Sequence, residues 1–255
     1  MTIEIEAIKA FSDNYIWAIH DDRHCVIIDP GEASGVLEFL GRTELQLSGF
    51  LLTHHHPDHI GGVARIRREH PAPAWGPADR RMPADMNVVG EGDRVQIPQP
   101  DLGFEVIETP GHTTSHIAFH GHGLLFSGDT LFSAGCGRLF EGTPKQMQAS
   151  LDKLAALPDS TLMYCGHEYT AANCAFARQV EPENPALLER SRQVAGLRED
   201  DRITLPSTIG DEKAFNPFLR TREPGVIQAA ARREPGAGRS PAEVFGVIRR
   251  WKDGQ

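Results

Sequence analysis

The sequence contains few features of an exported, membrane-bound or disulfide-stabilised protein. Its four cysteines form no CxxC motif, and their spacing in a chain of 255 residues suggests no disulfide framework. No apolar run approaches the ~18 residues that a membrane-spanning helix needs. The N-terminus lacks the basic and apolar regions of a signal peptide. We therefore expect a cytoplasmic protein with no membrane partner.

Basic residues are also in the minority. The chain has 26 Lys and Arg against 35 Asp and Glu, which gives a net charge of −9. An acidic surface opposes non-specific binding to DNA or RNA, so we expect no nucleic-acid partner. Hydrophobic residues make up 40% and charged residues 24%, a balance typical of a globular protein. The length allows one large domain or two unequal ones.

Hydrophobic periodicity divides the chain into a β-rich part and a helical part. Period-two alternation or short apolar runs predict strands at 3–8, 15–19, 25–29, 49–52, 104–108, 117–120, 124–127 and 162–164. Residues 70–103 are predicted to be rich in loops. Beyond Tyr169 the pattern predicts helices near 170–180, 185–200, 223–233 and 240–251. We predict an α/β domain over 1–168 and a small helical domain over 169–255.

Histidine and aspartate residues gather where apolar strands end. His54, His56, Asp58 and His59 lie within six residues, directly after a short apolar strand. Three later strands each lead into a glycine followed by one such residue, and these residues are His112, Asp129 and His167. Imidazole and carboxylate suit Zn²⁺, Fe or Mn²⁺. The pattern therefore indicates a metal site, because strand ends on one sheet edge are where α/β proteins assemble sites.

The other histidines fit plainer roles. His55 is expected to point away from its two neighbours, and His116 is expected to pack beside the ligands. The remaining five lie in polar, turn-like sequence, and we assign them no part in metal binding; they are His20, His24, His70, His120 and His122.

Four motifs resemble those of the metallo-β-lactamase superfamily: THHHPDHIGG, TPGHT, FSGDTLF and CGHEYT. Three further segments resemble the hydroxyacylglutathione hydrolases (glyoxalase II) in particular, namely GCGRLFEGT at 135–143, NPF at 216–218 and the C-terminal RRWKDG. The resemblance extends over essentially the whole chain. It implies a four-layer αββα sandwich with metals at one edge, followed by a small all-helical domain that completes the substrate pocket.

The resemblance also implies which residues hold two divalent metal ions. His54, His56 and His112 would bind one ion, Asp58, His59 and His167 the other, and Asp129 would bridge both. Zn²⁺ is the expected metal, with Fe or Mn²⁺ as alternatives. Asp58 is also expected to orient the water that attacks the substrate.

The implied reaction is hydrolysis of S-(2-hydroxyacyl)glutathione, expected to be S-D-lactoylglutathione, by a metal-bridging hydroxide. This is the second step of methylglyoxal detoxification. The resemblance assigns Arg249 and Lys252 to the glycine carboxylate of glutathione, and Arg138 and Tyr169 to its backbone. Some relatives carry Lys and Tyr where this chain has Arg138 and Phe140, and phenylalanine cannot form the hydrogen bond of that tyrosine. We expect a monomer with a small-molecule substrate.

Several rival functions remain open. A persulfide dioxygenase of the same fold would use one iron, whereas this chain keeps seven ligand-type residues. A β-lactamase would be expected to carry an export signal, and a tRNA-processing nuclease a basic face. A redox diiron protein would be expected to carry a flavin-binding domain. A non-enzymatic metal-binding protein would have no use for the GCGRLFEGT and RRWK segments.

Overall fold

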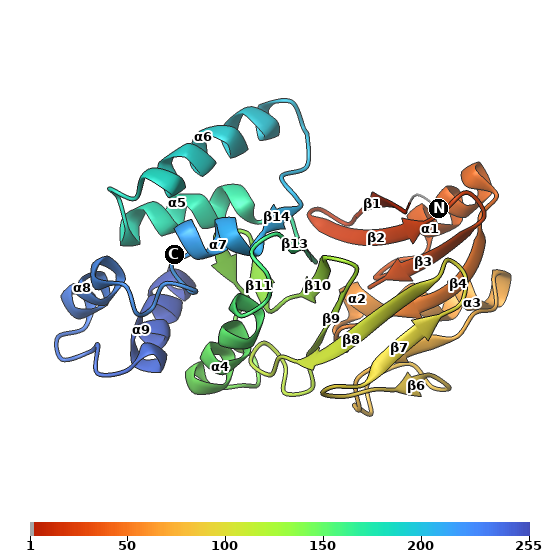
Figure 1. Cartoon of the computed structure of the whole chain (residues 1–255), viewed down its shortest axis with the longest axis horizontal. Coiled ribbons are helices and arrows are strands. Elements are labelled where there is room, and N and C mark those ends of the chain that lie inside the picture. Colours follow the sequence, from red (N-terminus) through yellow and green to blue (C-terminus); the bar gives the residue numbers. More distant parts are fainter. Residues whose placement is uncertain (1–2) are drawn as a thin grey trace. The chain divides into compact units, whose positions relative to one another are not determined.

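The alternating N-terminal segment forms the first strands of a six-stranded sheet in the computed structural model, which describes residues 3–255 (Figure 1). The chain folds into two compact units. The first unit extends to Glu108 and includes Ser115–Gly128, and the second contains Thr109–Thr114 and Asp129–Gln255. The domain boundary near residue 168 stays a prediction.

From residue 3 onward, the first unit contains ten strands and three helices. They are β1 (Glu4–Ala10), β2 (Asn14–His20), β3 (His24–Ile28), α1 (Ser34–Thr43), β4 (Gln46–Leu51), α2 (Pro57–Ile60), α3 (Val63–Glu69), β5 (Ala74–Gly76), β6 (Asn87–Val88), β7 (Arg94–Ile97), β8 (Leu102–Glu108), β9 (Ile117–Gly121) and β10 (Leu124–Gly128). The first sheet has the order β1-β2-β3-β4-β5-β6, antiparallel up to β3 and parallel from there. Strands β7 to β10 form an antiparallel meander.

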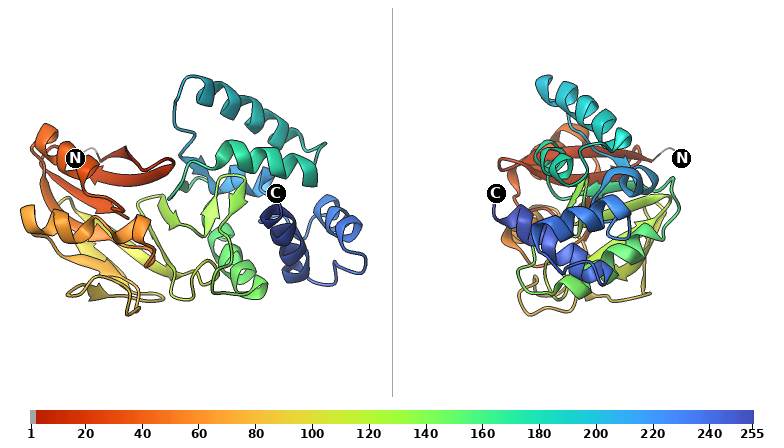
Figure 2. Two further views of the ribbon diagram at one scale, coloured as in Figure 1. Left: turned by 180° about the vertical axis from the view of Figure 1, so that it is seen from behind. Right: turned by 90° about the vertical axis from the view of Figure 1, so that its left-hand side faces the viewer.

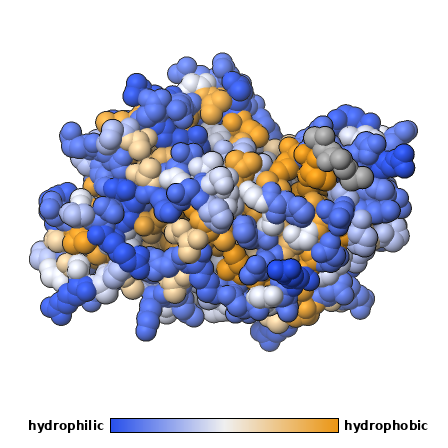
Figure 3. Space-filling model, viewed as in Figure 1, coloured by the Kyte–Doolittle hydropathy of each residue, from blue (hydrophilic) through white to orange (hydrophobic). Residues whose placement is uncertain are grey.

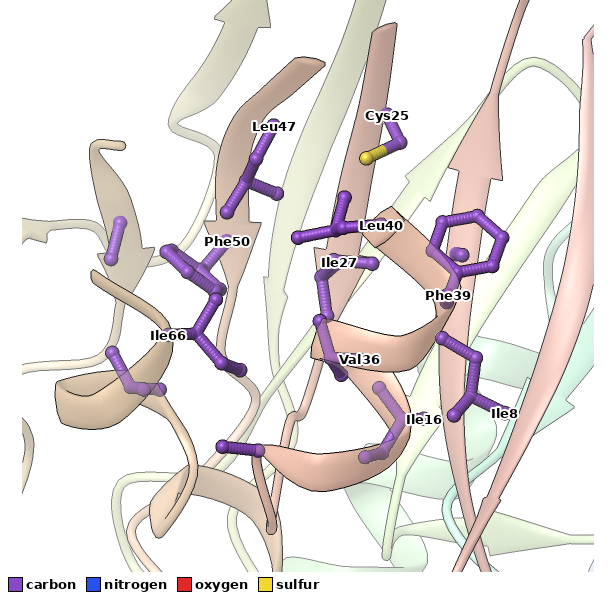
Figure 4. Close-up of a cluster of buried hydrophobic side chains, with 14 of the residues drawn as sticks. Ile8, Ile16, Cys25, Ile27, Val36, Phe39, Leu40, Leu47, Phe50 and Ile66 are labelled. Atoms are coloured by element: carbon purple, nitrogen blue, oxygen red, sulfur yellow. The ribbon is translucent and has the colours of Figure 1, made fainter. Parts of the chain in front are cut away.

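Helix α1 packs on one face of the first sheet because its apolar residues recur with helical spacing. Val36 and Leu40 of α1 lie over Ile16 and Ile27 of the sheet, and Phe39 lies beside Ile8 (Figure 4). The neighbouring residues along these strands, such as Trp17 and Ile28, point to the other face of the sheet and are also buried. Strands β7 to β10 lie on that other face (Figures 1 and 2). The stacked helix and sheets agree with the predicted α/β class.

The second unit is mainly helical, and beyond Tyr169 it contains helices at the positions that the sequence predicts. Its elements are β11 (Leu131–Phe132), β12 (Gly135–Cys136), α4 (Pro144–Ala155), β13 (Leu162–Cys165), α5 (Thr170–Val180), α6 (Pro185–Glu199), β14 (Ser207–Thr208), α7 (Ile209–Phe215), α8 (Pro224–Arg233) and α9 (Pro241–Asp253). Helices α5 and α6 lie side by side, as do α8 and α9 (Figure 2). Strands β11 and β12 form a short hairpin.

Two regions differ from the sequence-based expectation. The segment predicted to be rich in loops contains β5, β6 and β7, which are only two to four residues long and so carry too little alternation to be recognised. The sequence also does not predict α2, α7, β11, β12 and β14. The strands and helices that it does predict lie within a few residues of their predicted positions.

The drawn face of the molecule is mainly hydrophilic, with scattered apolar residues (Figure 3). Within residues 3–255, no helix combines the length and the apolar character that crossing a bilayer requires.

Phe50 on β4 provides a test of the core described for the first unit. Its side chain is 0% exposed and belongs to the cluster beneath α1 and α3. We expect Phe50→Ala to lower the free energy of unfolding by about 3–5 kcal/mol, because it removes buried apolar surface and leaves a cavity. Urea denaturation followed by circular dichroism measures this. Val88→Ala, at a residue that is 61% exposed, is the control, and equal effects of the two variants would contradict the packing.

Candidate metal centre

The histidine cluster of the first unit is built where β4 runs into α2. Pro57 begins α2, a position for which its fixed φ is suited, and the turn brings the side chains before and after it together. His54 Nε2 lies 3.1 Å from His56 Nδ1. The rings of His54 and His59 are 4.2 Å apart, centre to centre, and both are buried. The structure thus gathers the histidines that the sequence predicts to be ligands in this segment.

A buried carboxylate that the sequence analysis did not identify holds this cluster. Asp29 Oδ1 accepts a hydrogen bond from the Thr53 backbone N–H at 2.8 Å, and Oδ2 accepts one from Thr53 Oγ1 at 2.6 Å. Asp29 Oδ2 also lies 3.0 Å from His59 Nδ1. Potential ligand atoms of Asp29, His54 and His59 all lie within 4.8 Å of one another. Its signal in the sequence is an acidic residue directly after a buried apolar strand.

These hydrogen bonds assign the protons on two histidine rings. Thr53 Oγ1 donates its proton to Asp29, so the contact at 3.0 Å with His54 Nδ1 requires that Nδ1 donates. His59 Nδ1 donates to Asp29 in the same way. Both rings therefore present Nε2 as the lone-pair nitrogen, which is the form that binds a metal.

Asp58 is positioned from a different strand. The Asn14 side-chain amide, at the start of β2, donates to Asp58 Oδ2 at 3.0 Å. The same carboxylate oxygen lies 3.5 Å from His59 Nε2. Asn14 is buried, and the sequence offered no signal for its role, because its partner lies 44 residues away.

A second group of ligand-type residues belongs to the second unit. Asp129 Oδ2 lies 3.4 Å from His112 Nε2 and 3.3 Å from His167 Nε2. His112 Nδ1 donates to the Arg138 carbonyl oxygen at 2.8 Å, which again leaves Nε2 for a ligand. All three side chains are buried.

The spacing of these donor atoms fits a transition-metal ion. A tetrahedral ion with bonds of about 2.0–2.1 Å holds neighbouring donor atoms roughly 3.3–3.4 Å apart. The measured pairs lie between 3.1 and 3.5 Å in both units. Neutral imidazoles and carboxylates are also the donors that divalent ions of this class prefer. The residues present therefore fit divalent metal binding.

Two glycines allow the close backbone approaches that these groups need. Gly128 has φ +48, and a Cβ atom there would overlap Thr53 Oγ1. A Cβ atom at Gly137 would overlap the Asp129 carbonyl oxygen and would come within 3.2 Å of His112 Nδ1. Any larger residue at either position would displace a residue of the site.

His116 and His55 lie beside the ligand-type histidines. The His116 ring is fully buried and stacks on His54 with centroids 4.7 Å apart. His55 is buried, and its Nδ1 lies 3.6 Å from Asp79 Oδ2. Hydrogen bonds from Arg81 hold the pKa of the Asp79 carboxyl well below its ordinary value.

Three of the four residues predicted to bind substrate lie close together in the second unit. Asp253 Oδ1 accepts a hydrogen bond from Arg138 Nε at 3.2 Å and forms an ion pair with Arg249 Nη2 at 3.0 Å. Lys252 donates to the Asn173 side-chain oxygen. Burial, and then the nearby Arg249 guanidinium, lower the pKa of Lys252 to about 8.

Tyr169 belongs instead with the ligand-type residues. Its ring stacks on His167 with centroids 4.7 Å apart and planes inclined by 4°. Phe140 is exposed, and its ring lies edge-on to His112 at 5.2 Å. Both aromatic rings therefore contact histidines predicted to bind metal.

Comparison with protein-family models divides the chain into two matches. The model of the metallo-β-lactamase superfamily matches residues 11–167, and the model described as hydroxyacylglutathione hydrolase C-terminus matches residues 168–255. A protein named hydroxyacylglutathione hydrolase from Aeromonas hydrophila subsp. hydrophila is 51% identical over 248 residues. The alignment covers 96% of this chain and 97% of that relative.

Solved structures share the fold. The crystal structure of ETHE1 from Myxococcus xanthus has a TM-score of 0.68 and 26% identity, and the match covers 98% of this chain and 91% of that one. The crystal structure of TTHA1623 in a di-iron-bound form has a TM-score of 0.55 and 29% identity. That match covers 64% of this chain and 91% of that one.

The role of Asp29 can be tested through metal affinity. We expect Asp29→Asn to weaken metal binding by about 10- to 100-fold, because an uncharged amide orients the His59 ring less strongly than a carboxylate. Asparagine tolerates the positive φ of 49° at this position. Competition with a chromogenic chelator measures the affinity. Asp93→Asn, at an exposed carboxylate of the same unit, is the control, and an unchanged affinity in Asp29→Asn would contradict the role.

Proposed function

Because the chain belongs to the hydroxyacylglutathione hydrolase family of the metallo-β-lactamase superfamily, we propose that it hydrolyses the thioester of S-(2-hydroxyacyl)glutathione. The products are glutathione and a 2-hydroxy acid, and S-D-lactoylglutathione is the expected substrate. The observation that carries the proposal is 51% identity with a hydroxyacylglutathione hydrolase over 96% of the chain. The match of residues 168–255 to a model specific to that enzyme supports it.

The proposed cofactor is a pair of divalent metal ions. His54, His56 and His112 would hold one, Asp58, His59 and His167 would hold the other, and Asp129, which has two carboxylate oxygens, would serve both. The donor spacings within each unit support this assignment, and the di-iron form of TTHA1623 shows that a related protein takes two ions. Zn²⁺ is the proposed metal, with Fe and Mn²⁺ as alternatives.

Bound ions of this class would lower the pKa of a water ligand to about 7 and would stabilise negative charge on the substrate's carbonyl oxygen. The chain's own residues orient the reactants. Asn14 fixes the Asp58 carboxylate by a hydrogen bond of 3.0 Å, so that Asp58 is placed to accept a hydrogen bond from the attacking water. The thiolate leaving group has an ordinary pKa of about 8–9 and departs without a strong general acid.

Cations of the second unit bind the anionic substrate. Arg249 and Lys252 are assigned to the glycine carboxylate, and Arg138 and Tyr169 to the glutathione backbone. The assignment of Arg138 and Arg249 to one substrate is supported by their contacts with the same oxygen of Asp253. Cytoplasmic location and a monomeric state stay predictions of the sequence.

Steady-state hydrolysis of S-D-lactoylglutathione tests the proposed function. We expect purified protein with two metal ions per chain to reach a kcat/KM above ~10⁴ M⁻¹s⁻¹ and to lose this activity on chelation. Asp129→Ala should lose metal and activity together. Asp159→Ala, at an exposed carboxylate paired with Lys213, should retain both. A protein with one bound iron and no hydrolysis would contradict the proposal and favour the dioxygenase alternative.

The pH dependence of KM tests the assignment of Lys252. Its pKa of about 8 means that its positive charge is present below pH 8 and is lost as the pH rises through that value. We therefore expect kcat/KM to fall above pH 8, at most about tenfold per pH unit, mainly through a rise in KM. In Lys252→Arg the charge persists, and the fall should move to higher pH. Identical profiles for the two proteins would remove Lys252 from substrate binding.

A further inference from the structure

Asp253 occupies a central place among the cations of the second unit. It is the last residue of α9. Its Oδ1 accepts a hydrogen bond from Arg138 and pairs ionically with Arg249, and these two arginines lie 111 positions apart in the chain. Neither the sequence motifs nor the comparisons assign it a role. An anion in the midst of residues that bind an anionic substrate needs an explanation, because by charge alone it would repel that substrate.

We propose that Asp253 is a positioning residue that fixes the guanidinium groups of Arg138 and Arg249 in the arrangement that binds glutathione. This inference rests on the proposed function, since it concerns the glutathione end of that substrate. Asp253 acts through the two arginines and does not contact the reacting atoms.

The two arginines depend on Asp253 to different degrees. Arg249 is 5% exposed, and two further contacts hold it: Nη1 donates to the Cys136 carbonyl oxygen at 2.9 Å, and the guanidinium lies 5.3 Å above the Phe218 ring. The Arg138 side chain is 56% exposed. Without Asp253, the long side chain of Arg138 would sample many rotamers, and substrate binding would have to order it.

Two opposite effects can be compared. Asp253 is 32% exposed, so its screened repulsion of a substrate carboxylate changes affinity by about two- to fivefold. Ordering one long side chain weakens binding by about two- to twelvefold, so ordering two weakens it by about five- to 160-fold. The positioning effect is the larger, so removal of Asp253 should weaken substrate binding although it removes a negative charge.

Asp253 also helps to keep Lys252 charged. Four groups act on the Lys252 ammonium besides burial: Arg249 lowers its pKa, whereas Asp253, Cys136 of β12 and Cys174 of α5 raise it. Neutralising Asp253 should therefore shift the alkaline fall of kcat/KM to lower pH. A residue with a purely structural role would not move this profile.

The test compares Asp253→Ala and Asp253→Asn with wild type. We expect Asp253→Ala to raise KM for S-D-lactoylglutathione about tenfold with kcat within about twofold. Asp253→Asn keeps an acceptor oxygen and should give an intermediate KM, with its alkaline fall at lower pH than in wild type. Asp152→Asn disrupts another carboxylate–arginine pair, the bidentate contact of Asp152 with Arg222, and should leave KM unchanged. An unchanged or lower KM in Asp253→Ala would overturn the proposal.

Calorimetry with glutathione separates this inference from the proposed function. If wild type fails to hydrolyse the thioester, the proposed function fails, while weaker glutathione binding by Asp253→Asn than by wild type would still support the role of Asp253. If wild type hydrolyses the thioester and both Asp253 variants bind glutathione as tightly as it does, only the inference fails. If wild type neither hydrolyses the thioester nor binds glutathione, both fail. Thermal denaturation of each variant confirms that folded proteins are compared.

Discussion

Asp29 is a buried carboxylate whose two oxygens together receive the backbone and hydroxyl of Thr53 and the ring of His59. A buried anion is costly unless it is fully hydrogen-bonded, and here the hydrogen bonds that stabilise it also decide which ring nitrogen of His54 and His59 carries the proton. The orientation of the His54 and His59 rings therefore depends on one carboxylate, that of Asp29, directly after β3. The same hydrogen bonds thus stabilise the buried charge of Asp29 and orient the histidine rings.

In the second unit a comparable role falls to the segment between Asp129 and Arg138. Asn216 stabilises the turn between β11 and β12, because its side-chain amide donates to the carbonyl oxygens of Phe132 and Gly135 at 3.0 and 2.9 Å. The buried carboxylate of Glu212 accepts from the Ala134 N–H at 2.8 Å. At the far end, the Arg138 carbonyl accepts from His112. A short, strongly restrained segment thus connects a residue predicted to bind metal with one predicted to bind substrate.

The sequence predicts the parts of this protein whose signal is local. Apolar strands that end in glycine and then His112 or Asp129 could be recognised because strand, turn and ligand-type residue are consecutive. The roles of Asp29 and Asn14 could not, since their partners lie 24 and 44 residues away. Asp253 has one partner four positions away, Arg249, but its second partner, Arg138, lies 115 positions away, so their common contact could not be predicted. Strands β5 to β7 were missed for a different reason: each is too short for its alternation to stand out, and pairing with neighbouring strands defines them.

An acidic chain can bind an anionic substrate because electrostatic interactions in salt solution act only over short distances. At physiological ionic strength charges are screened beyond about 8 Å, so the net charge of −9 matters less at a binding site than the few charges within it. Arg249 and Lys252 lie near enough for the first to lower the pKa of the second, which shows that gathering cations has a cost. Asp253 offsets part of that cost, and this explains why a site for an anion contains an anion of its own.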